Sequence, residues 1–230
     1  MLQLKRHQEI LSLLKEKKEM TVKELCSTFY CSTATIRRDL LELEQKGLVK
    51  RSFGGAVLVE DFSNELPLSI RNISHVAEKK KICATAATLI HPGETIFLDA
   101  SSTVFLLYPY LKSVENLTVV TNNPKLNLVL SELNVRNLCT GGEMLNQSFA
   151  LVGSEAERFV RGIHAHSFFF SARGIHNRQI FDAPKEERDL KIAMLEHSSH
   201  HYLLYDASKE HRIFPFFITD FSNVDQVITA

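Results

Sequence analysis

Two adjacent arginines, Arg37 and Arg38, are the side chains of this chain best suited to hold a polyanion. A guanidinium group presents its N–H donors in a rigid fork, which matches a phosphate group or the edge of a guanine base. Hydroxyl and basic side chains stand close to this pair in the sequence: Ser32, Thr33, Thr35, Lys50 and Arg51. Hydroxyls add polar contacts, and further cations add contacts with phosphates. The set therefore predicts binding to double-stranded DNA.

The residues around the arginines predict two helices joined by a tight turn. Thr21 and Glu24 have the spacing of a capping box, which starts a helix, and Ser32 is a good N-cap for the next helix. Apolar residues of the second helix recur at i, i+4 and i+7 and are expected to face a small core: Ile36, Leu40 and Leu43. The arginines are left on the N-terminal half of this helix, the part that enters the major groove in helix-turn-helix proteins.

A basic hairpin is expected to follow. Residues 48–58, LVKRSFGGAVL, are typical of two short strands around a Gly-Gly turn. Such a wing places Lys50 and Arg51 against a phosphate backbone or a minor groove. Residues 1–58 are therefore predicted to form a winged helix-turn-helix domain. An arginine pair on an amphipathic helix is also typical of a solvated surface, and helix-turn-helix shapes also serve in protein–protein contacts.

Charge is distributed unevenly along the chain. The 230 residues contain 27 Lys and Arg and 27 Asp and Glu, so the net charge is zero. Residues 1–56 carry 11 basic and 7 acidic side chains, whereas residues 57–230 carry 16 and 20. A basic head on an acidic body is typical of a protein in which only the head contacts phosphates. The composition, 44% hydrophobic and 23% charged, excludes global disorder.

Cysteine usage and hydropathy bear on the compartment. The four cysteines lack CxxC spacing, which argues against a disulfide framework and against a structural zinc site. The first residues are charged rather than an apolar leader, and no apolar run approaches the roughly 20 residues that span a bilayer. We therefore expect a cytoplasmic protein with reduced thiols, no membrane association, no metal and no cofactor.

Residues 77–230 alternate between helical patterns and short apolar strands, after a linker of mixed composition at residues 59–76. This alternation predicts a mainly parallel α/β sheet covered on both faces. In such sheets ligands bind beyond the carboxyl ends of the strands. Polar residues follow four predicted strands, at positions 99–103, 121–123, 140–142 and 206–209. They predict a pocket in which the loop 101–103, placed before a helix, holds a phosphate, although polar strand ends are normally just turns.

The run STATIRRDLLELEQKG, followed by RSFGGA, resembles the N-terminal domain of the DeoR family of bacterial transcription regulators. That family has an S-x-x-T-I-R-R-D-L recognition helix and an R-x-x-G-G-A wing, and Phe53 stands where a His is usual. The resemblance implies that the arginine pair contacts bases or phosphates and that the three hydroxyl residues add polar contacts. It also implies that Lys50 and Arg51 anchor the DNA backbone. Asp39 is expected to orient an arginine or to pair within the domain.

The resemblance continues from about residue 78 to the end of the chain. The C-terminal domain of the DeoR family is a sensor that resembles sugar-phosphate isomerases and usually recognises a phosphorylated sugar or a related metabolite. Carried over residue by residue, the resemblance implies an effector site made of Asp99, Ser101, Ser102, Thr103, Thr121, Asn122, Gly141, Gly142, Arg173, Gly174, Glu187, Lys191, Asp206 and Lys209.

Several residues depart from the family pattern. Ser101 replaces a glycine of the phosphate loop, which restricts how closely the backbone approaches a ligand. His166 replaces an acid and Ser171 replaces a glycine, while Arg173 is set beside the expected pocket. This additional cation either favours a more anionic ligand or pairs with a neighbouring acid.

A histidine cluster is the main candidate for a metal. His197, His200 and His201 have i, i+3, i+4 spacing near the end of a helix predicted over residues 185–200, a spacing that suits a metal ion. Cationic and polar residues are, however, common at helix C-termini because of the helix dipole. We expect no functional metal at this cluster.

We predict a transcription regulator rather than an enzyme. Asp99, Glu187 and Asp206 are conceivable general bases, but His166 stands where an acid is expected, and a DNA-binding head has little use on a metabolic enzyme. The protein is expected to repress a carbohydrate-metabolism operon, to bind a two-half-site operator as a homodimer or homotetramer, and to respond to a phosphorylated effector. The alternatives are a sugar-phosphate isomerase-like enzyme and a DNA-binding protein whose body only oligomerises.

Overall fold

The structure is a computed structural model that describes residues 3–45, 48–52, 54–58 and 68–230. Contacts within it divide the chain into two units, Met1–Ser74 and His75–Ala230, which we call the head and the body. Phe53 and residues 59–67, which include half of the predicted linker, lie outside the described residues. Each unit has its own hydrophobic core.

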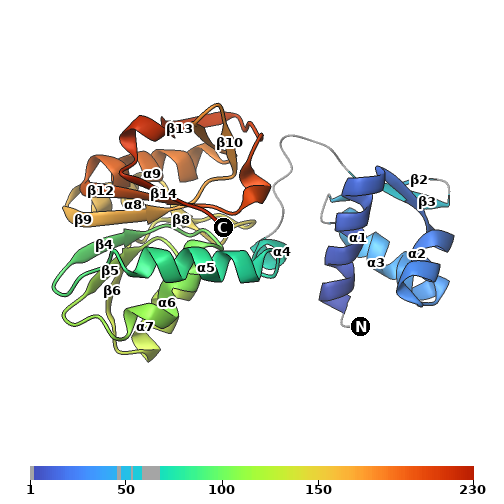
Figure 1. Cartoon of the computed structure of the whole chain (residues 1–230), viewed down its shortest axis with the longest axis horizontal. Coiled ribbons are helices and arrows are strands. Elements are labelled where there is room, and N and C mark those ends of the chain that lie inside the picture. The colour runs from blue at the N-terminus through green and yellow to red at the C-terminus, as the bar shows by residue number, and fades with distance from the viewer. Residues whose placement is uncertain (1–2, 46–47, 53, 59–67) are drawn as a thin grey trace. The chain divides into compact units, whose positions relative to one another are not determined.

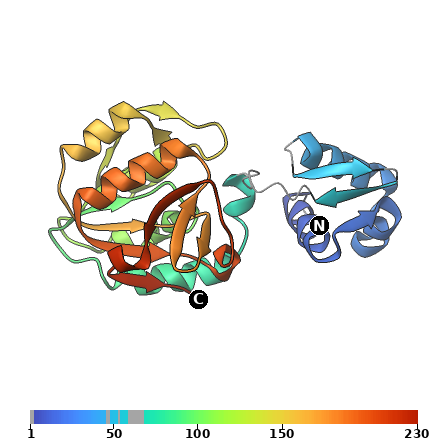
Figure 2. The same ribbon diagram turned by 90° about the horizontal axis from the view of Figure 1, so that it is seen from above.

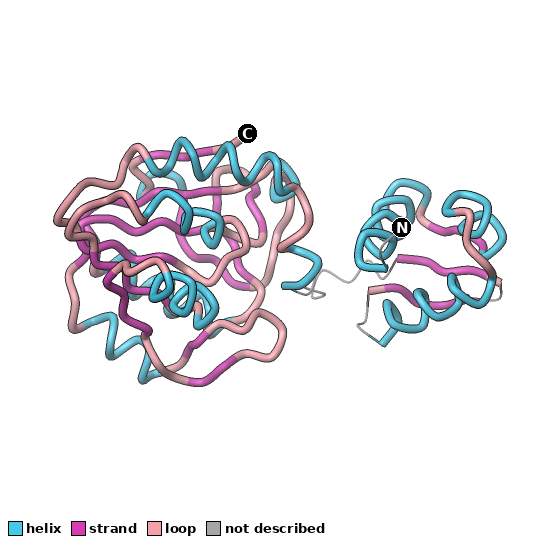
Figure 3. Tube along the Cα trace, turned by 90° about the horizontal axis from the view of Figure 1, so that it is seen from below, coloured by secondary structure: helices cyan, strands magenta, loops and turns pink. Residues whose placement is uncertain are grey.

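The head packs three helices against a small antiparallel sheet (Figure 3). Its elements are α1 (Gln3–Lys17), β1 (Glu19–Thr21), α2 (Val22–Phe29), α3 (Thr33–Gln45), β2 (Val49–Ser52) and β3 (Gly55–Leu58), followed by α4 (Leu68–Arg71). The strands pair in the order β1-β3-β2. The two predicted helices and the two wing strands are confirmed. The sequence patterns did not reveal β1, because three residues are too few to show a period.

Apolar side chains from all three helices of the head meet in one core. The predicted stripe of α3 is confirmed, since Ile36, Leu40 and Leu43 are all buried. The other helices and the wing contribute Ile10, Leu14, Leu25, Phe29, Val49 and Ala56. Because α3 turns this stripe inward, its opposite side faces the solvent.

Thr21 and Glu24 form the predicted capping box at the start of α2. The Thr21 hydroxyl accepts a hydrogen bond from the Glu24 amide at 3.2 Å, and the Glu24 carboxylate accepts one from the Thr21 amide at 2.7 Å. The hydroxyl and the amide of Thr21 together hold the pKa of Glu24 below its usual value. The box satisfies two of the amides that every helix start leaves without a helical partner.

Replacing Thr21 by Ala is expected to weaken the start of α2 by about 1 kcal/mol, because the Glu24 amide loses its acceptor. Amide hydrogen exchange measures this loss, and protection across α2 should fall roughly fivefold. Thr28→Ala is the matched control in the same helix, since the Thr28 hydroxyl only donates to the Glu24 carbonyl oxygen at 2.9 Å and caps no amide. Unchanged protection in the Thr21 variant would contradict this role of the box.

The body is built on a six-stranded parallel sheet with the strand order β14-β12-β9-β4-β5-β6. These strands are β4 (Thr95–Leu98), β5 (Thr118–Thr121), β6 (Arg136–Cys139), β9 (Ala165–Phe170), β12 (Ser198–Leu204) and β14 (Gln226–Ile228). One face carries α5 (Val76–Ala87), α6 (Tyr108–Leu111) and α7 (Pro124–Glu132), and the other carries α8 (Ser154–Arg161) and α9 (Lys185–Glu196) (Figures 1 and 2). The predicted mainly parallel sheet covered on both faces is confirmed.

Successive residues of the central strands face opposite sides of the sheet. Phe168 and Phe170 of β9 pack into the core beneath α8 and α9, whereas Phe169 packs into the core beneath α5 to α7. Phe97 of β4 and its neighbour Ile96 divide in the same way. Both faces of the sheet are therefore buried, which explains why these strands are continuous apolar runs in the sequence.

Short strands complete the body. An antiparallel sheet contains β10 (Gly174–His176), β11 (Gln179–Asp182) and β13 (Phe216–Asp220), and a hairpin contains β7 (Glu143–Met144) and β8 (Leu151–Val152). The sequence patterns did not indicate these strands. They contain two to five residues each, and β11 pairs with a segment more than thirty residues further along the chain.

The helix predicted after the 101–103 loop is confirmed only in its last four residues. The loop leads into a 3₁₀ turn, η1 (Val104–Leu107), and then into the four-residue α6, which has Pro109 in its first turn. Proline lacks the N–H that a continuous α-helix needs at that position. So short a helix carries little dipole, so it adds little to the phosphate site that was predicted at the 101–103 loop.

The prediction that His197, His200 and His201 lie together near the end of one helix is also wrong. Helix α9 ends at Glu196, and β12 begins at Ser198 because residues 198–203 pair with β9. His200 and His201 therefore lie on a strand, where neighbouring side chains point to opposite faces. The predicted helical i, i+3, i+4 face does not exist.

None of the helices in the described part of the chain is both long and apolar enough to cross a lipid bilayer.

Candidate nucleic-acid interface and effector site

The exposed side of α3 carries the predicted arginine pair. Arg37 and Arg38 are both exposed in the N-terminal half of this helix. A cleft of about 810 Å³ opens beside Arg37 and is bounded by α2, α3 and the wing. Its lining residues are Val22, Lys23, Cys26, Ser27, Thr33, Arg37, Leu40, Arg51, Gly54 and Gly55. The structure thus brings three predicted residues, Thr33, Arg37 and Arg51, to one concave surface.

Two of the predicted hydroxyls also build the start of α3. The Ser32 hydroxyl accepts a hydrogen bond from the Thr35 amide at 3.2 Å, as expected for an N-cap. The two hydroxyls bond each other at 2.9 Å. Ser32 and Thr35 therefore have a structural role in the helix start, whereas Thr33 is exposed beside the cleft.

The wing is tied to α3 through Arg51. Its backbone amide and its Nε both donate to the carboxylate of Glu44, at 3.0 and 2.6 Å. These bonds, the amide first, hold the pKa of Glu44 below its usual value. Arg51 thus fixes the wing beside the recognition helix and shares its charge with Glu44, while Lys50 is exposed on the same strand.

Asp39 pairs within the head, as one of its two expected roles required. It is fully buried and accepts two hydrogen bonds from Arg6, at 2.5 and 3.0 Å. Nε2 of His7 also lies 3.0 Å from its carboxylate. Burial alone raises the pKa of Asp39, but Arg6 and His7 outweigh it and hold the pKa low. The carboxylate joins α1 to α3, so its place in the sequence motif reflects folding rather than DNA contact.

Tyr30 and Lys23 are surface residues of the head that sequence reasoning missed. Tyr30 ends α2 in the left-handed backbone region, with a φ of 51°, and its ring is 95% exposed beside the start of α3. Lys23 lines the cleft. The available signal was that Lys23 lies in the helix before the arginine-bearing helix and that Tyr30 lies in the turn between the two.

In the body, the predicted effector residues gather at the carboxyl edge of the parallel sheet. Asp99 follows β4, Asn122 follows β5, Gly141 follows β6 and Asp206 follows β12. Because these four strands run parallel, their ends lie at one edge. Arg173 follows β9 at the same edge.

Lys191 holds the centre of a buried charge network at this edge. Its Nζ lies 2.5 Å from a carboxylate oxygen of Asp182, 2.9 Å from the Ser171 carbonyl oxygen and 3.3 Å from the Asp99 carboxylate. The burial of the ammonium group opposes its charge, but the three carboxylates around it, Asp182 foremost, raise the pKa of Lys191. This lysine is therefore a buried cation with its donors directed at the protein.

Arg173 extends the network to α9. Its Nε lies 2.8 Å from Asp182 and a terminal nitrogen lies 3.0 Å from Glu187. Burial raises the pKa of Asp182, yet the charges of Lys191 and Arg173 outweigh it and lower the pKa. Of the two roles expected for Arg173, pairing with a neighbouring acid is the one observed. Sequence reasoning missed Asp182, because nothing in its local pattern distinguishes it from a turn residue.

Other polar groups at the edge have buried atoms that lack a partner among the described residues. The side-chain amide of Asn122 donates to the Leu151 carbonyl oxygen at 3.1 Å, but its Oδ1 is buried and lacks a hydrogen bond to any described residue. The same holds for Oδ2 of Asp206. Lys79, which is 2% exposed and was not predicted, donates to the Ser102 hydroxyl at 3.1 Å. Buried polar atoms without partners are rare, and they suit a ligand.

Comparison with known families identifies this arrangement. The model of the DeoR-like helix-turn-helix domain matches residues 6–62, and that of the DeoR C terminal sensor domain matches residues 74–230. The chain belongs to the DeoR family. It is therefore a transcriptional regulator of the helix-turn-helix type.

Curated relatives of this DeoR-family chain carry regulator names. The uncharacterized HTH-type transcriptional regulator YulB of Bacillus subtilis is 36% identical over 91% of this chain and 81% of its own length. The HTH-type transcriptional regulator GolR of Listeria innocua is 33% identical over 100% and 91%. The lactose phosphotransferase system repressor of Staphylococcus epidermidis is 31% identical over 87% and 81%.

Solved structures resemble the fold of this DeoR-family body. The eIF2B delta protein of Chaetomium thermophilum has a TM-score of 0.51 with 18% identity and covers 69% of this chain and 57% of that one. Ribose 5-phosphate isomerase A of Neisseria gonorrhoeae has a TM-score of 0.42 with 14% identity and covers 57% and 52%.

His166, one of this chain's departures from the DeoR pattern, lies away from the predicted effector residues. It stands near the amino end of β9, is exposed, and accepts a hydrogen bond from the Thr95 amide at 3.0 Å. The predicted pocket is at the opposite, carboxyl end of the strands. The expectation that His166 occupies the place of a catalytic acid is therefore wrong in geometry.

Two glycines of the DeoR pattern have packing reasons. Gly142 has a φ of +101°, and a Cβ there would lie 2.3 Å from the Val152 carbonyl oxygen. A Cβ on Gly174 would lie 2.4 Å from the Arg212 carbonyl oxygen. Both positions allow close approach of backbone segments, and neither contact involves a ligand.

Proposed function

We propose that this DeoR-family regulator represses a carbohydrate-metabolism operon and that a phosphorylated sugar or related metabolite controls it. The observation that carries the DNA-binding half is the exposed arginine pair at the start of α3, next to a cleft bounded by the wing. A helix that presents guanidinium groups from its N-terminal half enters the major groove in this class of domain. The wing cations Lys50 and Arg51 then contact the phosphate backbone.

The effector site is proposed at the carboxyl edge of the sheet. The buried network around Lys191 lies at this edge, and its cations and carboxylates neutralise one another. Next to this network, the 101–103 loop supplies hydroxyls and amides, and Lys79 and Lys209 supply positive charge. The Oδ1 atom of Asn122 suits a sugar hydroxyl donor. A phosphorylated polyhydroxy compound matches this mixture of donors, acceptors and cations.

Regulation rather than catalysis is favoured by the state of the acids. Asp99 accepts hydrogen bonds from the amides of Ser101 and Ser171 and lies beside Lys191, and Glu187 is paired with Arg173. Both carboxylates are thus engaged with donors of the protein rather than directed at a substrate carbon, as a general base must be. The relative named a lactose phosphotransferase system repressor supports both repression and a link to a sugar.

We propose that the regulator acts in the cytoplasm as a homodimer or homotetramer. One short recognition helix makes few contacts, and two linked heads on two half-sites bind more tightly through their effective concentration. Effector binding at the sheet edge shifts the populations of head arrangements and so changes operator affinity.

Thermal unfolding in the presence of sugar phosphates tests the effector site. A ligand at a hundred times its dissociation constant should stabilise the body by about 2.7 kcal/mol, which raises Tm by about 5 °C for a chain of this size. Asn122→Ala should reduce the shift, because the ligand loses the unpartnered carbonyl oxygen. Ser167→Ala is the matched control, since its buried hydroxyl also lacks a described partner but lies within β9, away from the strand end.

The controls separate the proposed function from its rivals. The same sugars without phosphate, and inorganic phosphate alone, should produce much smaller shifts. If no phosphorylated sugar stabilises the protein, the body only oligomerises. If a stabilising sugar phosphate is converted to its isomer by the protein, the enzymatic alternative holds.

A further inference from the structure

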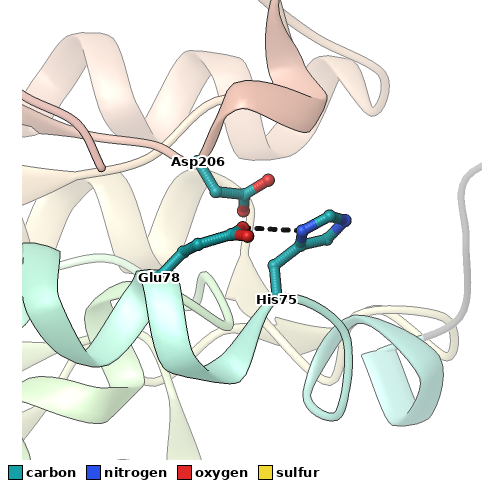
Figure 4. Close-up of side chains that lie close together, drawn as sticks. All are labelled: His75, Glu78 and Asp206. Atoms are coloured by element: carbon teal, nitrogen blue, oxygen red, sulfur yellow. Dashed lines mark hydrogen bonds and ion pairs between the residues drawn. The ribbon is translucent and has the colours of Figure 1, made fainter.

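Three side chains that belong to no predicted metal site converge where the body begins. His75 immediately precedes α5, Glu78 lies in the first turn of that helix, and Asp206 follows β12. One potential ligand atom from each lies within 4.8 Å of the others. Figure 4 shows the imidazole and the two carboxylates pointing toward one another. We call these three residues the α5 cluster.

Asp206 provides an independent sign that the α5 cluster suits a cation. Its side chain is 1% exposed, and Oδ1 accepts a hydrogen bond from the Ser208 amide at 3.1 Å. Oδ2 is buried and lacks a hydrogen-bond donor among the described residues. Buried carboxylate oxygens are almost always bonded or bound to a cation, and this carboxylate faces the cluster.

The charges of the α5 cluster point to a cation rather than to an anion. Glu78 and Asp206 place two carboxylates side by side, which repel each other unless a positive charge lies between them. Burial raises the pKa of Asp206, but a hydrogen bond from the Ser208 side chain and the charges of Lys209, Lys79 and His75 outweigh it and hold the pKa low.

The imidazole completes a mixed donor set. Nδ1 of His75 lies 2.7 Å from Oε2 of Glu78, so the nitrogen and the carboxylate already lie next to each other, where one ion could contact both. One imidazole nitrogen and two carboxylates suit first-row divalent ions, whereas Ca²⁺ prefers oxygen ligands alone. The nearby charges of Lys79 and Lys209 oppose a metal, so binding should be weaker than at a structural zinc site.

We propose that His75, Glu78 and Asp206 bind a divalent first-row transition-metal ion of the Mn²⁺ type. The ion joins the start of α5 to the end of β12 and leaves coordination positions open to water. A metal at this position departs from the sequence expectation of none. The metal site shares Asp206 with the proposed effector site but does not require that the effector be a phosphorylated sugar.

Mn²⁺ titration of the chelator-treated full chain tests the site. Free aqueous Mn²⁺ is counted from its electron paramagnetic resonance signal, and we expect one bound ion per chain. His75→Ala and Glu78→Gln should each weaken binding at least tenfold, given that even residues behind metal ligands cost about 10- to 100-fold. Both variants should unfold at the wild-type temperature without metal, since His75 is exposed and Glu78 is only partly buried.

His200→Ala is the matched control. His200 also lies near one carboxylate, with its Nδ1 3.6 Å from Asp225, and both side chains are exposed. Its removal should leave Mn²⁺ binding unchanged. Absence of bound Mn²⁺, or equal loss in the His75 and His200 variants, would overturn the proposal. The increase in unfolding temperature that sugar phosphates cause should also be measured in Glu78→Gln. If this variant no longer binds Mn²⁺ but is still stabilised by the sugar phosphate, the metal site and the effector site are separate.

Discussion

Replacing Arg37 and Arg38 together by Ala is expected to lower operator affinity at least about a hundredfold, because each well-placed guanidinium contributes roughly 1–3 kcal/mol of recognition. Both side chains are exposed, so their removal leaves the core of the head intact. The slope of log affinity against log salt should also become shallower by about one for each phosphate that the variant no longer touches. Mapping the chromosomal sites occupied by the protein supplies the operator for a fluorescence-anisotropy measurement.

The matched control for this variant is Arg158→Ala with Arg161→Ala. These arginines lie on α8 of the body and are exposed, so the control removes the same charge from a surface not proposed to contact DNA. Its operator affinity should stay near the wild-type value. Unchanged binding by the α3 variant, or equal losses in both variants, would refute the assignment of α3 as the recognition helix. Single variants then separate base reading, which alters sequence preference, from phosphate contact, which does not.

Replacing Asp182 by Ala is expected to lower the free energy of unfolding of the body by about 3–5 kcal/mol, because Lys191 and Arg173 are left buried without their shared carboxylate. Asp182 is 0% exposed and lies 2.5 Å from Lys191 and 2.8 Å from Arg173. Chemical denaturation followed by circular dichroism measures the loss. Asp189→Ala is the matched control, since Asp189 pairs with Lys185 and Arg188 nearer the surface of α9. Pairs of that kind contribute only about 0–1 kcal/mol.

The same carboxylate makes a pH dependence that can be measured. Lys191 and Arg173 lower the pKa of Asp182 in the folded state, although burial alone raises it. A carboxyl group with a lowered folded pKa stabilises the protein above its unfolded pKa, which is about 3.9. That stabilisation is lost as the pH falls through the folded value. Wild-type stability should therefore decline steeply below about pH 4, and Asp182→Asn should decline less. If the stability of the wild type and of Asp182→Asn fell equally with decreasing pH, the proposed role of this network would be contradicted.

Several elements of the fold were predictable because the forces behind them act between near neighbours. The capping box of Thr21 and Glu24 spans four residues, and the buried stripe of α3 repeats once per turn. The apolar runs of β4, β5 and β9 likewise show that both faces of the sheet are covered. In each case the residues that form the contact or the hydrophobic pattern lie within one short segment of the chain.

The proposed sites were predictable only in outline. The parallel sheet brings Asp99, Asn122 and Asp206 to one edge, as the alternation of strands and helices predicted. Whether a side chain there is open to a ligand was not predictable. Arg173 and Lys191 seemed suited to an anion, but their charges are directed at Asp182. His166 was expected to stand where the family has an acid, and it lies near the amino end of its strand, away from the predicted site.

Local sequence therefore specified the helices of the head, the arginine pair on α3 and the layered α/β architecture of the body, because capping and hydrophobic periodicity are properties of short segments. The partners of the buried charges came only from the folded chain. Asp39 pairs with Arg6, and Asp182 pairs with Lys191 and Arg173, across separations that no local pattern encodes. The physical reason is that a charge in a low-dielectric interior must be neutralised by whichever group the packing places beside it.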